Sequence, residues 1–322
     1  MTPAQTARDV WPRVAVMGAG AVGCYFGGML ARAGARVTLI GRRAHVEAIA
    51  REGLFLDSVH FQEHVEVAAS TLPEAARGAS LVLFAVKAND TEQTAQALAP
   101  HLDPGATILS LQNGADNVAR IRAAAKLEAL PAVVYVAASM PEPGHVKHVG
   151  RGDLVIGDFD GNAARREEIE RLAATFVRAG VPCRVSGNIE GELWTKLIMN
   201  CAYNAISALG QAKYGTIARN PETRDLMGRV IEEAVAVARA AGVRLPEQDL
   251  FAAGIKLGET IHEATSSTAQ DIARGKRTEI DSLNGYIVRR GRELGIATPV
   301  NHVLFVLVKL LEESLPLDRP SR

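Results

Sequence analysis

Short apolar runs alternate with amphipathic stretches along the first half of the chain. Continuous runs such as 14–17 and 81–86 are typical of strands that are covered on both faces of a parallel sheet. Between them, apolar residues recur every three or four positions, which predicts helices. The expected strands are 14–17, 36–40, 81–86, 107–111, 133–138, 145–149, 154–157 and 183–185, with a small hairpin or edge excursion over 53–69; the expected helices are 24–32, 72–78, 90–98, 115–125 and 163–179.

The pattern changes near residues 186–190, where long amphipathic stretches replace the apolar runs. These stretches predict helices at 189–209, 221–241, 247–258, 265–274, 279–294 and 300–314. We therefore predict an α/β Rossmann-type N-terminal domain followed by an all-α C-terminal domain. The expected boundaries are an extension at 1–12, a dinucleotide-binding domain at 13–187 and a helical substrate domain at 188–322.

The first turn carries the motif Gly18-Ala19-Gly20-Ala21-Val22-Gly23, between a predicted strand and a predicted helix. This context favours a dinucleotide-binding fingerprint over a chance match. Gly18 would permit the tight turn, Gly20 would let a pyrophosphate approach the backbone, and Gly23 would let the helix pack close to the sheet. A membrane span over 14–31 is the alternative, because the stretch is uncharged. Its five glycines, and the lack of a signal-like basic flank before it, favour the nucleotide site.

The composition limits the binding partners that we expect for this protein. Lysine plus arginine equals aspartate plus glutamate, 36 of each, so the net charge is zero. Neither nucleic acid nor an acidic membrane surface is expected as a partner. The three cysteines suggest no disulfide framework, and a cytoplasmic protein is expected. Cys24 is interpreted as a small residue that fills space beside the glycine turn.

The residue that selects the cofactor follows the second strand. No acidic residue occurs between Gly18 and Val46, and Arg42 and Arg43 stand where an acidic side chain would bind the ribose of NAD. Arginine suits a 2′-phosphate, so the sequence predicts NADP (NADPH); two solvated surface arginines are the alternative. Lys87 and Asn113 each follow an apolar strand, and both are plausible residues of the same site.

A polar row is predicted on the first helix of the second half. Lys196, Asn200 and Asn204 are spaced by four and share one face of an otherwise apolar helix. A hydrated surface stripe is the alternative, but a surface helix normally shows several charges. A partly buried lysine suits general acid catalysis.

Two histidine patterns are interpreted as structural. His60 to His64 matches H-x-x-E-H, but that zinc pattern requires a helix, and this segment alternates like a strand. His145 and His148 follow a turn and are also expected to be structural. No metal site is predicted.

Together these motifs resemble the ketopantoate reductase (2-dehydropantoate 2-reductase) family, within the 6-phosphogluconate-dehydrogenase-like group. The resemblance runs from about Arg13 to Leu311. It rests on the glycine motif, Val86-Lys87, Gln112-Asn113-Gly114, the polar row, and the segments 267–271, 278–281 and 284–285.

The resemblance implies roles for individual residues. Lys196 would be the lysine that protonates the developing alkoxide, and Glu279 would hold the substrate hydroxyl. Arg42 would contact the 2′-phosphate, and Glu279 is also expected near the cofactor. Three more positions, Asn200, Asn204 and Ser267, would bind substrate, while Lys87 and Asn113 would lie near the nicotinamide and the carbonyl. Beyond Asn204 the family often places another polar residue that contacts the substrate. This chain has Tyr214 in that region, which departs from the family pattern.

The implied activity is NADPH-dependent reduction of ketopantoate to pantoate, in pantothenate biosynthesis. Two alternatives stay open: a related reductase of another small 2-oxo or hydroxy acid, and a non-catalytic NADP-sensing protein. Retention of both Lys196 and Glu279 argues against the sensor. A monomer or a homodimer is expected.

Overall fold

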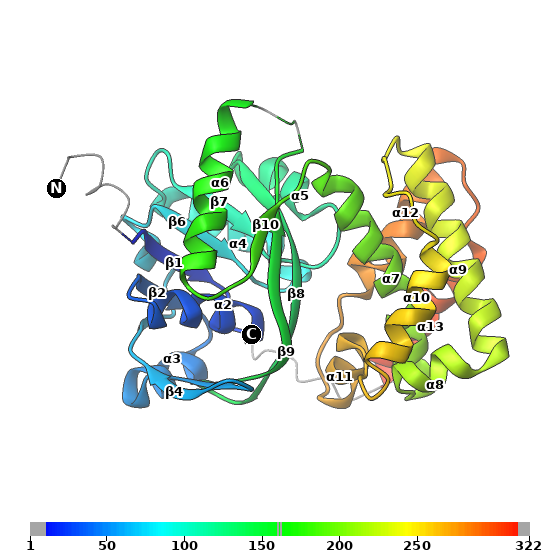
Figure 1. Cartoon of the computed structure of the whole chain (residues 1–322), viewed down its shortest axis with the longest axis horizontal. Helices are drawn as coiled ribbons and strands as arrows, with labels where there is room; N and C mark the ends of the chain where they lie inside the picture. Colours follow the sequence, from blue (N-terminus) through cyan, green and yellow to red (C-terminus); the bar gives the residue numbers. More distant parts are fainter. Residues whose placement is uncertain (1–10, 160, 162, 315–322) are drawn as a thin grey trace. The chain divides into compact units, whose positions relative to one another are not determined.

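The computed structural model describes residues 11–159, 161 and 163–314. Most of the extension expected at 1–12 therefore lies outside the described residues. The chain divides into two compact units between Ile189 and Glu190, two positions after the expected boundary (Figure 1).

Six strands of the first unit form a parallel array. The spatial order β5-β2-β1-β6-β7-β8 corresponds to 3-2-1-4-5-6 when these six strands are numbered along the chain, which is the order of a Rossmann fold. The strands are β1 (Arg13–Met17), β2 (Arg36–Ile40), β5 (Ala68–Ser70), β6 (Leu81–Phe84), β7 (Thr107–Ser110) and β8 (Ala129–Glu142). The predicted fold class of this half is thus confirmed.

The other end of the sheet is built on a long antiparallel pair, β8 with β9 (His145–Ile156). Strand β3 (Leu54–Ser58) pairs with β9 and with β4 (Gln62–Val65), and β10 (Cys183–Val185) pairs with β9. The prediction of separate strands at 145–149 and 154–157 was wrong. Gly152 lies within β9 and does not end the strand. A Cβ at this position would collide with the hydroxyl of Tyr25, so the glycine permits the close packing of Tyr25 on β9.

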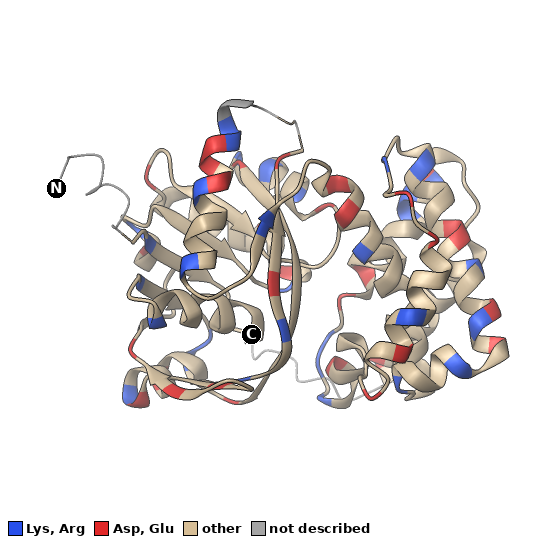
Figure 2. Cartoon of the chain, viewed as in Figure 1, with Lys and Arg blue, Asp and Glu red and all other residues tan. Residues whose placement is uncertain are grey.

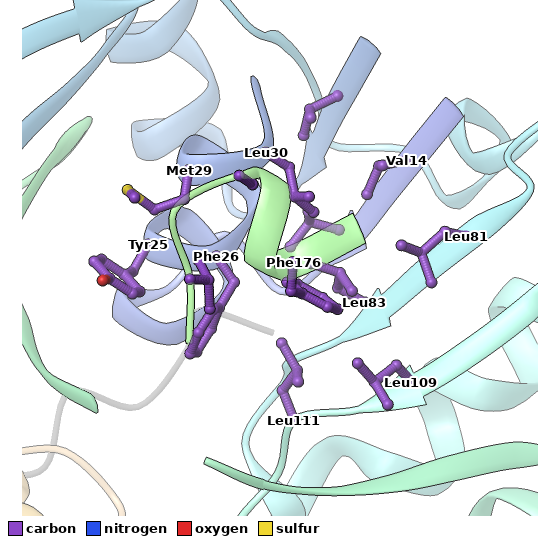
Figure 3. Close-up of a cluster of buried hydrophobic side chains, with 14 of the residues drawn as sticks. Val14, Tyr25, Phe26, Met29, Leu30, Leu81, Leu83, Leu109, Leu111 and Phe176 are labelled. Atoms are coloured by element: carbon purple, nitrogen blue, oxygen red, sulfur yellow. The ribbon is translucent and has the colours of Figure 1, made fainter. Parts of the chain in front are cut away.

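Helices cover both faces of the parallel array. Helices α2 (Ala21–Arg32) and α6 (Ala163–Arg178) bury their apolar faces with Val14 and Val16 of β1 (Figure 3). Helices α4 (Thr91–Leu98) and α5 (Asn117–Ala125) pack with Ala15 and Met17 on the opposite face. Alternate residues of one strand therefore enter two separate cores, which explains why the strand is a continuous apolar run.

Several short elements complete the first unit. Helix α3 (Arg43–Glu52) directly follows β2, a helix that the sequence did not predict. The 3₁₀ turns are η1 (Pro73–Ala76), η2 (Ala88–Asp90) and η3 (Ala99–His101).

The second unit is helical throughout its described part, residues 190–314, as predicted. Its first helix, α7, begins at the boundary and carries the polar row. The elements are α7 (Ile189–Gly210), α8 (Tyr214–Arg219), α9 (Pro221–Ala240), α10 (Leu250–Thr260), α11 (Ser267–Ala273), η4 (Ile280–Ser282), α12 (Asn284–Leu294) and α13 (Pro299–Ser314).

The helix predicted over 279–294 is broken. A single 3₁₀ turn, η4, comes first, and α12 begins only at Asn284. The Thr278 hydroxyl accepts a hydrogen bond from the amide of Ile280, two residues on, at 3.2 Å. This local bond favours a turn over a continuing helix.

No helix within the described ranges combines the length and apolarity needed to span a bilayer. The stretch 14–31, for which a membrane span was the alternative, forms strand β1, the glycine turn and most of α2.

Candidate active site

The glycine turn joins β1 to α2. Gly18 has a φ of +113°, and a Cβ there would lie 2.6 Å from the carbonyl carbon of Ala85. This conformation and this contact both require glycine. A Cβ on Gly23 would collide with the carbonyl oxygen of Gly18, so Gly23 permits the close return of α2 onto the turn.

Gly20 has open space on its outer side, since a Cβ there would meet no atom within 4 Å. It caps α2 without a side-chain hydrogen bond. The first N–H groups of α2, at Ala21 and Val22 among them, have no partner within the helix itself. Together with the positive end of the helix dipole they form an arrangement that suits a pyrophosphate.

Arg42 stands at the carboxyl end of β2 and caps the N-terminus of α3. Its side chain is exposed, and so is that of Arg43, the first residue of α3. Arg43 lies 3.9 Å from Glu47 on the same helix, a long and exposed ion pair. A phosphate beside Arg42 would meet both a guanidinium and a helix N-terminus.

Lys87 follows β6, the neighbour of β1, and Asn113 follows β7, the next strand beyond β6. A buried polar network joins their two loops. The side-chain amide of Gln112 donates to the carbonyl of Val86 at 3.2 Å and to the hydroxyl of Thr91 at 2.7 Å. Asn117 in turn donates to the carbonyl of Asn113 at 2.7 Å.

The sequence reasoning missed this network. Gln112, Thr91 and Asn117 are each less than 10 % exposed, so their polar groups must be satisfied inside the protein. Arg120 extends the network, because it donates to the carbonyl of Ala88 at 2.7 Å and pairs with Glu92 at 2.7 Å. The backbone beside Lys87 and Asn113 is therefore held rigidly. A polar Gln directly after a buried strand was the signal that could have revealed it.

In the second unit, the polar row lies along α7. Lys196 and Asn200 are half-buried, and Asn204 is 2 % exposed. The row is therefore not a hydrated surface stripe at its C-terminal end. Asn204 donates to the hydroxyl of Ser267 at 3.5 Å and accepts from the hydroxyl of Tyr214 at 3.4 Å.

Neighbouring bonds fix this corner of the second unit. Ser266 donates its hydroxyl to the main-chain carbonyl of Asn204 at 3.1 Å and accepts from Ala269 at the start of α11. Tyr214 is buried, and its ring stacks on that of Tyr203 at 4.3 Å. Burial raises the pKa of Tyr214, so its hydroxyl remains a hydrogen-bond donor at neutral pH.

Glu279 lies in the turn that precedes η4 and is 7 % exposed. The residue before it, Thr278, donates its amide to Glu312 on α13 at 2.6 Å. Lys309, also on α13, bridges Glu312 at 3.1 Å and Asp281 at 3.0 Å. Burial lowers the pKa of Lys309, but its bonds to the two carboxylates outweigh burial and leave that pKa above its usual value.

One histidine of each pattern contacts neighbouring groups of the first unit. His64 lies in β4 as predicted, with Nδ1 2.9 Å from the carbonyl oxygen of Glu52. His148 is buried, and its two ring nitrogens lie 3.1 Å from the Ser58 hydroxyl and from the Arg151 carbonyl. Across the part of the chain that the structure describes, no three acidic, histidine or cysteine side chains gather as a metal site.

Cys24 is fully buried on α2, directly after the glycine turn, and burial raises its pKa to about 12. It is therefore an inert, space-filling residue, as predicted. Basic and acidic side chains are interspersed over the elements of both units (Figure 2).

The described residues define a class: a Rossmann-type dinucleotide-binding unit followed by a helical unit with a half-buried lysine–asparagine row. Family models for "Ketopantoate reductase PanE/ApbA" and its C-terminal domain match residues 14–161 and 188–312. The chain belongs to the ketopantoate reductase family, whose members are NAD(P)H-dependent oxidoreductases.

Individual relatives resemble the chain over nearly its whole length. The 2-dehydropantoate 2-reductase of Pyrococcus horikoshii is 34% identical, over 93% of this chain and 97% of the relative. A PanE/ApbA family ketopantoate reductase from Ralstonia eutropha JMP134 is 53% identical, with a TM-score of 0.87 over 93% of this chain and 98% of that one. A D-mandelate dehydrogenase, solved with NADH and anilino(oxo)acetate, is 25% identical with a TM-score of 0.88 over 95% and 99%.

Proposed function

We propose that this protein reduces 2-dehydropantoate to pantoate with NADPH. The observation that carries the proposal is the contact between Asn204 and Ser267, two positions 63 residues apart that the family resemblance assigns to substrate. They meet in a helical unit that also carries Lys196 and Glu279. The curated relatives named 2-dehydropantoate 2-reductase support the same activity.

The first unit is proposed to hold the cofactor. The open side of Gly20 and the free helix N-terminus suit the pyrophosphate, and exposed Arg42 suits a 2′-phosphate. Lys87 and Asn113 would contact the nicotinamide end and the substrate carbonyl, because Lys87 follows β6, the neighbour of β1, and Asn113 follows β7, the next strand of the sheet. NADPH, when bound, supplies a hydride.

The second unit is proposed to hold the substrate and to supply a proton. As negative charge develops on the carbonyl oxygen, the ammonium of Lys196 donates a proton to that oxygen. Asn200, Asn204 and Ser267 would orient the carboxylate and the chain of the substrate. Glu279 would accept a hydrogen bond from its 4-hydroxyl. The residues therefore orient both ends of the molecule, which accounts for much of the rate in such reactions.

A second candidate is reduction of a different 2-oxo acid. The similarity to D-mandelate dehydrogenase favours it, as does Tyr214, which occupies a place where the family often has another polar contact. An NADP-sensing protein without turnover is the third. We further propose a cytoplasmic monomer or homodimer; the three cysteines form no disulfide among the described residues.

One experiment separates these candidates. The purified protein is mixed with NADPH or NADH and with ketopantoate, 2-oxoisovalerate or phenylglyoxylate, and nicotinamide absorbance is followed. We expect the highest kcat/KM for NADPH with ketopantoate. A higher value for another acid identifies the second candidate, and cofactor binding without turnover of any acid identifies the sensor.

A further inference from the structure

The turn that carries Glu279 is held by a helix that is distant in the sequence. The main-chain amide of Thr278 donates to Oε1 of Glu312 at 2.6 Å, a charge-assisted bond because the acceptor is a carboxylate. Oε2 of Glu312 lies 3.1 Å from Nζ of Lys309, and the same ammonium lies 3.0 Å from Asp281. Helix α13 therefore contacts the chain at Thr278, one residue before Glu279, and at Asp281, two residues after it.

The contact between Thr278 and Glu312 is buried: Thr278 is 1 % exposed and Glu312 is 4 % exposed, and Ile280 beside it is fully buried. The pair of Lys309 and Asp281 is partly exposed. Within the turn, the Thr278 hydroxyl also accepts from the amide of Ile280. The backbone on both sides of Glu279 thus has little freedom, which limits the positions that its carboxylate can reach.

Stability alone is a weak explanation for this arrangement. A buried ion pair is often no more stabilising than well-packed apolar residues of similar volume, because both charges must lose their water. The bond from the Thr278 amide to the buried Glu312 carboxylate instead fixes the position of the Glu279 turn relative to α13. This position matters, because a displacement of about 1 Å in a catalytic geometry can lower a rate by about 10²-fold.

We propose that Glu312 is a positioning residue for Glu279, acting through the amide of Thr278, with Lys309 holding the Glu312 carboxylate in place. This inference rests on the proposed function, because it concerns the residue that is proposed to recognise the substrate hydroxyl. Glu312 itself need not touch the substrate. Its role is to set where the Glu279 carboxylate stands.

The test compares Glu312→Ala with Glu312→Gln and with a matched control, Glu233→Ala. Glu233 also anchors α13 through main-chain amides, those of Val300 at 2.8 Å and Asn301 at 2.9 Å, but it does so at the other end of the helix. Loss of either carboxylate should lower the melting temperature. Only Glu312→Ala should change recognition of the substrate.

We expect Glu312→Ala to lower kcat/KM for ketopantoate at least tenfold and to reduce the preference for ketopantoate over 2-oxoisovalerate, with an unchanged Kd for NADPH. Glu312→Gln keeps an oxygen for the Thr278 amide and should recover most of that loss. In a Glu279→Ala background, Glu312→Ala should have no further effect on the preference, because the two residues act as one.

Parent-like kcat/KM and preference in folded Glu312→Ala, or the same change of preference in Glu233→Ala, would overturn the inference. If Glu312→Ala does not fold, Lys309→Met provides the test, because it removes the ion pairs with Asp281 and Glu312. We expect it to reduce the preference for ketopantoate over 2-oxoisovalerate. An unchanged preference would overturn the inference. A parent protein that does not reduce ketopantoate contradicts the proposed function instead, so the two failures are distinguishable.

Discussion

The hydroxyl of Tyr214 donates to Oδ1 of Asn204 over 3.4 Å inside the second unit. With the amide in this orientation, Oδ1 of Asn204 faces the tyrosine and Nδ2 faces Ser267. The departure from the family pattern at 214 thus has a structural consequence.

Tyr214→Phe should therefore remove the hydrogen bond to Asn204 and keep the packing of the buried ring. A neutral hydrogen bond contributes about 0.5–1.5 kcal/mol, so kcat/KM for ketopantoate should fall roughly three- to tenfold. Tyr203→Phe is the matched control, because Tyr203 stacks on Tyr214 but donates to the Gly254 carbonyl at 2.7 Å. Equal effects of the two substitutions would contradict a role in orienting Asn204.

Arg42→Ala should reveal the cofactor preference. Loss of a charge-assisted contact costs about 1.5–3 kcal/mol, so KM for NADPH should rise at least tenfold while KM for NADH changes little. Arg43→Ala should have a smaller effect, because Arg43 already faces Glu47. Initial rates with both cofactors measure this, and a parent enzyme that uses NADH and NADPH equally would refute it.

Lys196→Ala should remove the general acid. We expect kcat to fall by about 10²–10⁴-fold, while NADPH still binds with its parent Kd. Thr195→Ala serves as a control on the same helix, since the Thr195 hydroxyl only bonds the Gly191 carbonyl at 2.8 Å. Steady-state rates and a cofactor titration suffice. A Lys196→Ala kcat within threefold of the parent would exclude this lysine from the mechanism.

Glu279→Ala should strongly weaken discrimination by the substrate hydroxyl. A site built to bond a hydroxyl can reject an analogue that lacks it by about 10⁴–10⁵, so the parent should strongly prefer ketopantoate over 2-oxoisovalerate. The variant should lose most of that preference, chiefly through lower kcat/KM for ketopantoate. If the ratio of the two kcat/KM values is unchanged, Glu279 does not recognise the hydroxyl.

An alternative role for Glu279 at a helix dipole loses support from the structure. Helix α12 begins at Asn284, five positions after Glu279, and the dipole effect is confined to the first turn. A change in substrate preference would therefore be difficult to attribute to the helix.

Alkaline pH should destabilise the fold through buried thiols. Burial raises the pKa of Cys24 from 9.0 to about 12, and the pKa of Cys183 shifts similarly. Between these values the unfolded chain loses the thiol proton and the folded chain keeps it, so the free energy of unfolding falls as pH rises from about 9 to 12. Urea unfolding at several pH values should show a shallower decline for Cys24→Ala than for the parent; identical slopes would contradict it.

Local patterns were sufficient for most of the fold. The strands β1, β6 and β7 are recognisable because burial on both faces requires continuous apolar runs. Helices α3 and α8 were not predicted; α8 has only six residues, too few to show a helical repeat of apolar positions. The start of the helix predicted at 279 was wrong because the turn there is held by α13, which no local pattern encodes.

In the candidate site, too, some residues could be predicted from the sequence, whereas the contacts that hold them could not. Residues that follow strands, such as Lys87 and Asn113, can be found from the order of the pattern alone. The bonds that hold them cannot: Gln112 to Thr91 spans 21 positions and Thr278 to Glu312 spans 34. Such pairs arise only once the topology has brought distant segments together.

The hold of Glu312 on Thr278 also sets an order of assembly during translation. Domains fold as units from the N-terminus as the nascent chain emerges, at roughly 5–20 residues per second. The first unit ends at Ile189, and Glu312 is made 123 positions later (312 minus 189), a delay of roughly 6–25 s at those rates. A ribosome-bound chain would therefore carry a complete dinucleotide-binding unit before the Glu279 turn acquires its anchor.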